Sequence, residues 1–326
     1  MSGFLRFLKQ WTLPVAIAVG TFSYLLFYCV PALDEAGQVL GPIFDTIFPL
    51  SVFATLFITF CRVDFHQMRP HRWHIGVLVV QTLLISLNVG LILWMESVGD
   101  ASQGGILHDK LLWEAVLTCI IAPSATAAPV IVGKLGGNIS TMSAFTVISS
   151  FTQALMIPIV FPLLEQVAGL TFWAAFLIIL KKLALVLLLP LALGWLVQHH
   201  IRRLYLWIAS KPNLNFYCWS FSLSITAGIT VKNIINSTAS ASLLTLIALF
   251  TLIVCFIQYV LGRGVGHWLG EPLNSGQALF QKNTALSIWV AYMYLHPVAS
   301  VGAGCYVLWQ NIINSLELWR YDHGKT

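Results

Sequence analysis

Four consecutive polar residues, Gln281, Lys282, Asn283 and Thr284, interrupt the apolar run GQALFQKNTALSIWVAYMYL at residues 276–295. An ammonium, two amides and a hydroxyl together offer the donors that hold an anion, and a lysine that titrates can also carry a proton. An ammonium near the centre of a bilayer costs roughly 3 kcal/mol on insertion scales, so a lysine kept there normally has a function. Lys282 is therefore the first candidate site residue.

A second interrupted stretch, APSATAAPV, occupies residues 122–130. Pro123 and Pro129 each remove a backbone donor and flank a run of small residues that includes Ser124 and Thr126. One interpretation is a simple proline kink, and the other is a broken helix at a binding site. Backbone groups freed by a break are tolerated only against protein or a water-filled cavity. We expect the broken helix, because both stretches carry polar interruptions.

The composition indicates that the elements holding these residues lie in a bilayer. The chain has 326 residues, of which 58% are hydrophobic and only 9% are charged, far from the usual values for soluble domains. A helix needs about 20 apolar residues to span the hydrocarbon core. On that rule the sequence predicts ten spans, at residues 11–30, 42–62, 73–95, 111–133, 139–164, 171–198, 213–231, 241–262, 275–294 and 297–318.

The positive charges predict how the spans are oriented. Connections on one side carry only Lys110 and Lys232, whereas the other side carries Arg6, Lys9, Arg62, Arg69, Arg72, Lys134, Arg202, Arg203, Lys211, Arg263, Arg320 and Lys325. Lysine and arginine accumulate on the cytoplasmic side. We expect an integral protein of the inner or plasma membrane with both termini in the cytoplasm, and a net charge of +5 that reflects topology and not nucleic-acid binding.

Ten spans divide into two halves of five, residues 11–166 and 171–320. An odd number of spans forces the second half to lie upside down relative to the first, as in inverted-repeat transporters. Pro123 and Asn283 lie at equal distances from Trp11 and Thr171, the starts of their halves. The expected fold is therefore all-α, one polytopic domain over residues 1–326 with two inverted five-helix repeats and broken crossing helices 4 and 9.

Several stretches resemble the bile acid:sodium symporter (BASS) family. The segments APSATAAPVIVGKLGGN and QKNTALSIWVA are similar to its fourth-span and ninth-span crossovers, LWQNIINS to the end of its tenth span, and IGVLVVQ to its third-span segment with a glutamine, here Gln81. The resemblance implies a panel domain and a core domain, alternating access, and an organic-anion substrate, bile-acid-like or a small carboxylate, bound beside the crossover.

The same resemblance implies a divergent member that lacks most of the sodium site. The positions that match the family's acidic residue, Ser-Asn pair and fifth-span serine hold Ala278, Ala128, Pro129 and Met142. Thr146 and Gln81 remain as oxygen donors, and Lys282 stands where the glutamine would be. Sodium needs several oxygen ligands and usually a carboxylate, so we expect transport that does not depend on sodium. A sodium-coupled symporter with an unrecognised site is the alternative.

Two roles for Lys282 stay open at this stage. Its ammonium either replaces the missing ion and holds the crossover by hydrogen bonds to carbonyls of the broken helices, or it titrates, because burial favours the neutral amine. The second role would couple transport to a proton. Lys181 and Lys182 also fall in an apolar stretch, where they either line a substrate path or extend their ammonium groups to the interface.

Two other classes of function compete with a transporter. An intramembrane enzyme is disfavoured, because the sequence has no pair of midplane aspartates, no zinc-binding His-Glu-x-x-His and no serine with a histidine inside the membrane. A membrane sensor or receptor on the same fold, which binds without transporting, remains possible. The six cysteines are dispersed without metal-like spacing, so the sequence predicts no metal and no cofactor.

Overall fold

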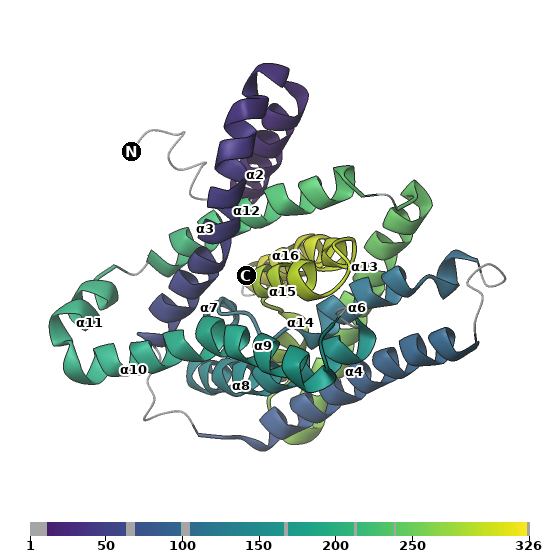
Figure 1. Ribbon diagram of the computed structural model, residues 1–326. Helices are drawn as coiled ribbons and strands as arrows, with labels where there is room; N and C mark the ends of the chain where they lie inside the picture. Colours follow the sequence, from purple (N-terminus) through teal and green to yellow (C-terminus); the bar gives the residue numbers. More distant parts are fainter. Residues whose placement is uncertain are drawn as a thin grey trace.

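The computed structural model describes residues 12–62, 69–98, 105–165, 169–211, 214–237 and 239–324, and almost all of them are helical (Figure 1). Of the residues used above to predict orientation and repeat boundaries, Arg6, Lys9, Trp11 and Lys325 lie outside the described residues. Within the described part of the chain the all-α prediction is confirmed.

Five of the described helices are long and apolar enough to cross a membrane. They are α3 (Asp34–Phe60), α4 (Arg72–Val98), α8 (Ile139–Leu164), the continuous stretch of α9 (Phe172–Leu183), η4 (Ala184–Leu188) and α10 (Leu189–His200), and α13 (Ala241–Leu269). Large apolar side chains such as Phe22, Leu87 and Trp173 are exposed on the outside. Because a soluble protein rarely leaves so much apolar surface open, the chain is membrane-embedded.

The remaining helices are shorter or more polar. They are α2 (Thr12–Cys29), η1 (Pro31–Leu33), η3 (Ile106–His108), α6 (Lys110–Ile121), α7 (Ala128–Lys134), α11 (Arg202–Ala209), α12 (Leu214–Ile235), α14 (Pro272–Phe280), α15 (Thr284–Tyr294) and α16 (Ala299–His323). The sequence did not predict α11, which lies within an expected connection. It is amphipathic, with Ile208 buried and Leu206 and Trp207 exposed.

Side-chain caps fix where several helices begin. The Asn138 carboxamide oxygen accepts hydrogen bonds from the Ser140 and Thr141 amides at the start of α8 (3.0 and 3.2 Å). The Ser240 hydroxyl accepts from the Leu243 amide at the start of α13 (3.2 Å). Each cap satisfies amides that the first helical turn leaves without partners.

The helices pack in two groups that meet along a seam. One group contains α2, α3, α10 and α12, in which α12 packs against α2 and α3, and α10 packs against α3. In the other, α16 packs against α6, α13 and α15, and α13 packs against α14. Figure 1 shows α15 and α16 near the centre of the molecule, with α12 and α3 beside them. Contacts of α15 with α3 and α12 join the two groups.

A glycine allows α16 to approach α6 closely. A Cβ atom at Gly302 would lie 2.3 Å from the carbonyl oxygen of Ala115, which belongs to the backbone of α6 and cannot rotate away. The contact places the first turn of α16 against the middle of α6, and Gln310, two turns further along α16, contacts Lys282. Side chains of α16 can therefore reach the interruption.

Candidate functional site

Two helices stop at the stretches that the sequence singled out. Helix α6 ends at Ile121 and α7 begins at Ala128, while α14 ends at Phe280 and α15 begins at Thr284. We call residues 122–127 and 281–283 the crossover. Its two segments run antiparallel, with a bridge between Ser124 and Lys282.

Backbone hydrogen bonds hold the two segments together. The Ala125 amide donates to the Gln281 carbonyl (2.8 Å), and the Asn283 amide donates to the Pro123 carbonyl (2.9 Å). Each segment therefore satisfies backbone groups that the other helix interruption leaves open. The crossover is consequently a two-segment unit, with Pro123, Ser124 and Gln281 to Asn283 in direct backbone contact.

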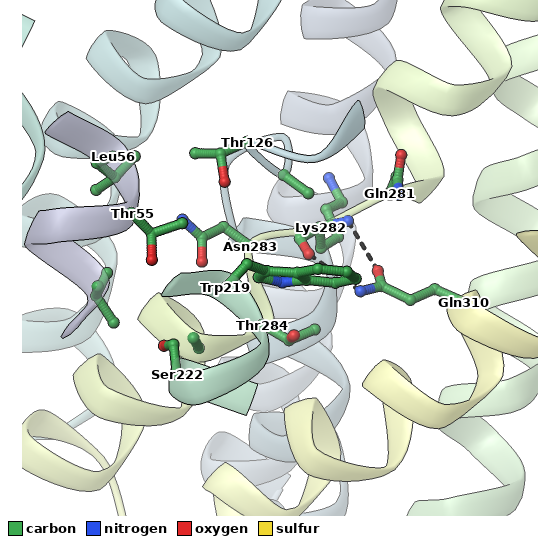
Figure 2. Close-up of a pocket in the computed structure, with 13 residues that line it drawn as sticks. Thr55, Leu56, Thr126, Trp219, Ser222, Gln281, Lys282, Asn283, Thr284 and Gln310 are labelled. Carbon is green, nitrogen blue, oxygen red and sulfur yellow. Dashed lines mark hydrogen bonds between the residues drawn. The ribbon is translucent and has the colours of Figure 1, made fainter. Parts of the chain in front are cut away.

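Side chains from two neighbouring helices fix this backbone. Gln310 on α16 accepts from the Lys282 amide (2.9 Å) and donates to the Lys282 carbonyl (3.3 Å), as the dashed lines in Figure 2 show. Ser149 on α8 accepts from the Ser124 amide (2.9 Å). The positions of both crossover segments are thus set by α8 and α16.

Asn283 has a second role as the cap of α15. Its carboxamide oxygen accepts from the Leu286 amide (3.2 Å), in the first turn of that helix. Figure 2 shows the carboxamide pointing from the crossover toward Thr55 on α3. The same side chain therefore fixes the start of α15 and reaches the opposite side of the seam.

A small cavity of about 20 Å³ lies where the crossover meets α3 and α12. The crossover and the first residues of α15 contribute Thr126, Gln281, Lys282, Asn283 and Thr284. Figure 2 shows Trp219 lying flat across the cavity from the α12 side, with Thr55 and Ser222 near it. The complete lining also includes Val52, Leu56, Ala125, Ala285 and Gln310.

The Lys282 side chain is 1% exposed, and its ammonium has no hydrogen-bond partner within the described residues. Hydrogen bonds from the ammonium to helix-end carbonyls, one of the two roles that the sequence left open, are not among the contacts of the described residues. The Cys119 thiol on α6 is its titratable neighbour. Lys282 is held by its backbone, and its side-chain nitrogen is left without a hydrogen-bond partner.

Protein donors already bond to three carbonyls at the two helix ends. The Gln81 amide donates to the carbonyls of Ile120 (2.8 Å) and Ala122 (3.0 Å), where α6 ends. The Tyr306 hydroxyl donates to the Phe280 carbonyl, where α14 ends (2.7 Å). An ammonium or a bound cation would have to compete with these donors for the same oxygens.

The remaining sequence candidates lie beside the cavity and do not line it. Gln81 is committed by its amide to the end of α6. The Thr146 hydroxyl donates to the Met142 carbonyl of its own helix, α8 (3.0 Å). Pro129 is buried in the first turn of α7. The crossover and cavity thus bring together seven of the ten candidates: Pro123, Ser124, Thr126, Gln281, Lys282, Asn283 and Thr284.

Sequence reasoning missed the residues that other helices bring to the cavity: Thr55, Trp219, Ser222 and Gln310. Gln310 had a usable signal, because it is a carboxamide inside an apolar span, in LWQNIINS. The other three look like ordinary span residues, and only tertiary packing makes them neighbours of Lys282.

Lys181 and Lys182 lie on the surface of α9, far along the chain from the crossover, and both side chains are exposed. The Lys182 ammonium lies 5.6 Å from the centre of the Tyr294 ring at the end of α15, which is within the range of a cation–π contact. Neither lysine lines the crossover cavity.

No protein-family model matches this chain, and no curated protein sequence matches it either. The resemblance of its crossover motifs to the BASS family therefore stays a prediction, and the function is inferred from the geometry of the site.

Proposed function

We propose that this chain is a secondary transporter that moves an organic anion across a membrane by alternating access. The proposal assigns ten spans in two inverted five-helix repeats, with α6 and α7 as the broken fourth span and α14 and α15 as the broken ninth. The antiparallel contact between the two interruptions supports it, because inverted repeats bring equivalent segments together in opposite directions. The panel domain would be α2, α3, α10 and α12.

The observation that carries the proposal is the buried, unpartnered ammonium of Lys282 at a cavity between the two helix groups. Buried charges in proteins are normally paired, because leaving one alone in a low-dielectric environment costs several kcal/mol, on the order of the insertion penalty. An anion entering the cavity would supply the missing charge. The site therefore favours an anionic substrate, bile-acid-like or a small carboxylate.

The cavity also lies between the two helix groups, where alternating access requires a binding site. One wall comes from α3 and α12, and the other from the crossover and α15, so a rocking motion of one group against the other would change both walls. At about 20 Å³ the cavity holds no more than a water-sized group, which corresponds to a closed seam. Transport would require that the seam open on one side at a time.

The same geometry supports independence from sodium. Donors of the protein occupy the carbonyls at the ends of α6 and α14, and the Lys282 charge would repel a second cation nearby. On this proposal the coupling ion is a proton carried by Lys282, or transport is uncoupled.

A second candidate, a sodium-coupled symporter, is favoured by one observation. Three buried side-chain oxygens near the crossover lack hydrogen-bond partners within the described residues: those of Gln81, Ser124 and Gln281. They could contribute to a sodium site if Lys282 were neutral. The site would still lack the carboxylate that usually compensates the ion.

Two measurements on the purified protein test the proposal. A thermal-shift screen of cholate and pyruvate, with sodium or choline as the cation and across pH, shows whether an anion binds. Uptake of the binding anion into proteoliposomes then separates a transporter from a sensor, which would bind without uptake. Loss of roughly tenfold or more of the uptake on replacing sodium, which corresponds to about 1.4 kcal/mol, would favour the sodium-coupled candidate instead.

A further inference from the structure

A second cavity, of about 110 Å³, lies along the same seam between α3, α12 and α15. Its walls are apolar and aromatic, with Phe48 from α3, Ile229 from α12, and Trp289, Tyr292 and Met293 from α15. An apolar cavity of about 150 Å³ is known to hold a benzene ring. This cavity is somewhat smaller but borders the surface at the exposed Met293, so a single-ring ligand can enter it with one edge outside. The crossover cavity, in contrast, has no room for a ring.

One cationic side chain, Lys232, lines the second cavity near the end of α12. It is half-buried, and no carboxylate pairs with it within the described residues. An ammonium beside apolar walls interacts more strongly with an anion than it would in bulk water. The cavity thus combines a cationic end with an aromatic body.

The walls of this cavity are held in place. The neighbouring Asn233 side chain donates to the Ser300 hydroxyl on α16 (2.7 Å), which fixes this end of α12 against the other helix group. Phe48 is almost fully buried in the main apolar cluster. While the seam is closed, packing of the helices therefore sets the shape of the cavity.

The second cavity is separate from the crossover cavity, although the same three helices form both. Phe48 lies one helical turn from Val52, Trp289 lies one turn from Ala285, and Ile229 lies about two turns from Ser222. The lining residues of the two cavities are therefore about 6 to 10 Å apart along the helices that they share. Lys232 lines the second cavity, and Lys282 lines the crossover cavity.

We propose that this second cavity is an independent binding site for a single-ring aromatic acid. The ring lies between Phe48 and Trp289, and the carboxylate contacts the Lys232 ammonium. The ring matches the aromatic walls and the acid group matches the Lys232 ammonium. A ligand with only one of these groups would contact only one of the two. This binding goes beyond the proposed function, because it involves Lys232 and not Lys282 and requires no transport.

The test uses the full-length protein in detergent and two fluorinated probes followed by ¹⁹F NMR. The first is 4-fluorobenzoate, and the second is 4-fluorobenzamide, which has nearly the same shape without the charge. We expect Lys232→Gln to weaken 4-fluorobenzoate binding by about tenfold or more, the effect of losing a charge-assisted hydrogen bond, and to leave 4-fluorobenzamide binding unchanged. Lys232→Arg keeps the charge and should retain binding.

Three further variants make the outcome specific. Lys134→Gln removes an exposed lysine on α7 and should change neither probe's binding. Met293→Trp, at an exposed position on the edge of the cavity, should fill it and weaken both probes. Lys282→Met should retain 4-fluorobenzoate binding.

The opposite results overturn the inference in distinguishable ways. If Lys232→Gln binds 4-fluorobenzoate as the wild type does, the second cavity is not the anion site. If Lys282→Met removes that binding while Lys232→Gln keeps it, the probe occupies the crossover. The second-site inference then fails, and the proposed function gains support.

Discussion

Replacing Lys282 by methionine should make the empty protein more stable and, at the same time, a weaker anion binder. Methionine has a similar volume to lysine but no charge. The ammonium costs roughly 3 kcal/mol in a bilayer-like environment, and no hydrogen bond within the described residues offsets that cost. The Gln310 hydrogen bonds to the Lys282 backbone would survive the change, because they do not involve the side chain. The backbone bonds of its neighbours, Asn283 with Pro123 and Gln281 with Ala125, would survive for the same reason.

The expected size of both effects can be worked out. Removing the unpaired charge should raise the free energy of unfolding by up to about 3 kcal/mol. For a chain of this length one kcal/mol corresponds to roughly 2 °C, so Tm should rise by up to about 6 °C. A charge-assisted hydrogen bond to the anion contributes about 1.5–3 kcal/mol, so Lys282→Met should weaken anion binding by roughly 10- to 150-fold.

The assays are thermal unfolding in detergent without ligand and a titration with the anion that shifts Tm most. Lys134→Met is the matched control, because it removes an exposed lysine and should change the free energy of unfolding by less than about 0.5 kcal/mol. A fall in the Tm of Lys282→Met would refute the reasoning, since it would mean that the ammonium has a structural partner. Unchanged anion binding would refute the assignment of Lys282 to the substrate.

Other substitutions and conditions give further expectations. Replacing sodium with potassium or choline should change uptake by less than about tenfold, measured in proteoliposomes with equal anion gradients. Asn283→Leu should abolish uptake and lower the free energy of unfolding by about 1 kcal/mol, because it removes the cap of α15, whereas Asn283→Asp should keep the stability. Normal uptake by the leucine variant would place the binding site elsewhere. Gly302→Ala should destabilise the protein by about 1–3 kcal/mol in thermal unfolding, because the new methyl group meets the Ala115 carbonyl; an unchanged Tm would show that α16 can shift away from α6.

Much of the fold could be predicted from local signals. Apolar runs marked the long helices α3, α4, α8 and α13, because a bilayer requires continuous apolar length. Prolines and polar residues marked the ends of α6 and α14, since helix interruption is largely a local property of the chain. Helix α11 was missed, because an amphipathic helix with arginines at its start looks like a charged connection.

Some residues of the candidate site could be predicted from the sequence and others could not, for a physical reason. Lys282, Asn283 and Thr126 were found because polar groups are conspicuous in apolar sequence. Trp219 and Thr55 were not, because a tryptophan or threonine in a span is ordinary until packing brings it to the crossover. The sequence left the role of the Lys282 side chain open between two alternatives, and it could not show that Gln81 and Tyr306 donate to carbonyls at the helix ends.

On the proposed function, the unpaired ammonium of Lys282 would add to the affinity for the anion. Bound at 100 times its Kd, an anion would stabilise the wild type by about 2.7 kcal/mol, close to the roughly 3 kcal/mol that the empty site loses to the unpaired ammonium. The saturated wild type and the empty Lys282→Met variant should therefore unfold at similar temperatures. A site that paired Lys282 with a carboxylate would be more stable when empty and would gain less from its ligand. The stability that the empty protein lacks at Lys282 is thus regained when the anion binds. On the proposed function, that stability is lost again when the seam opens and the anion leaves.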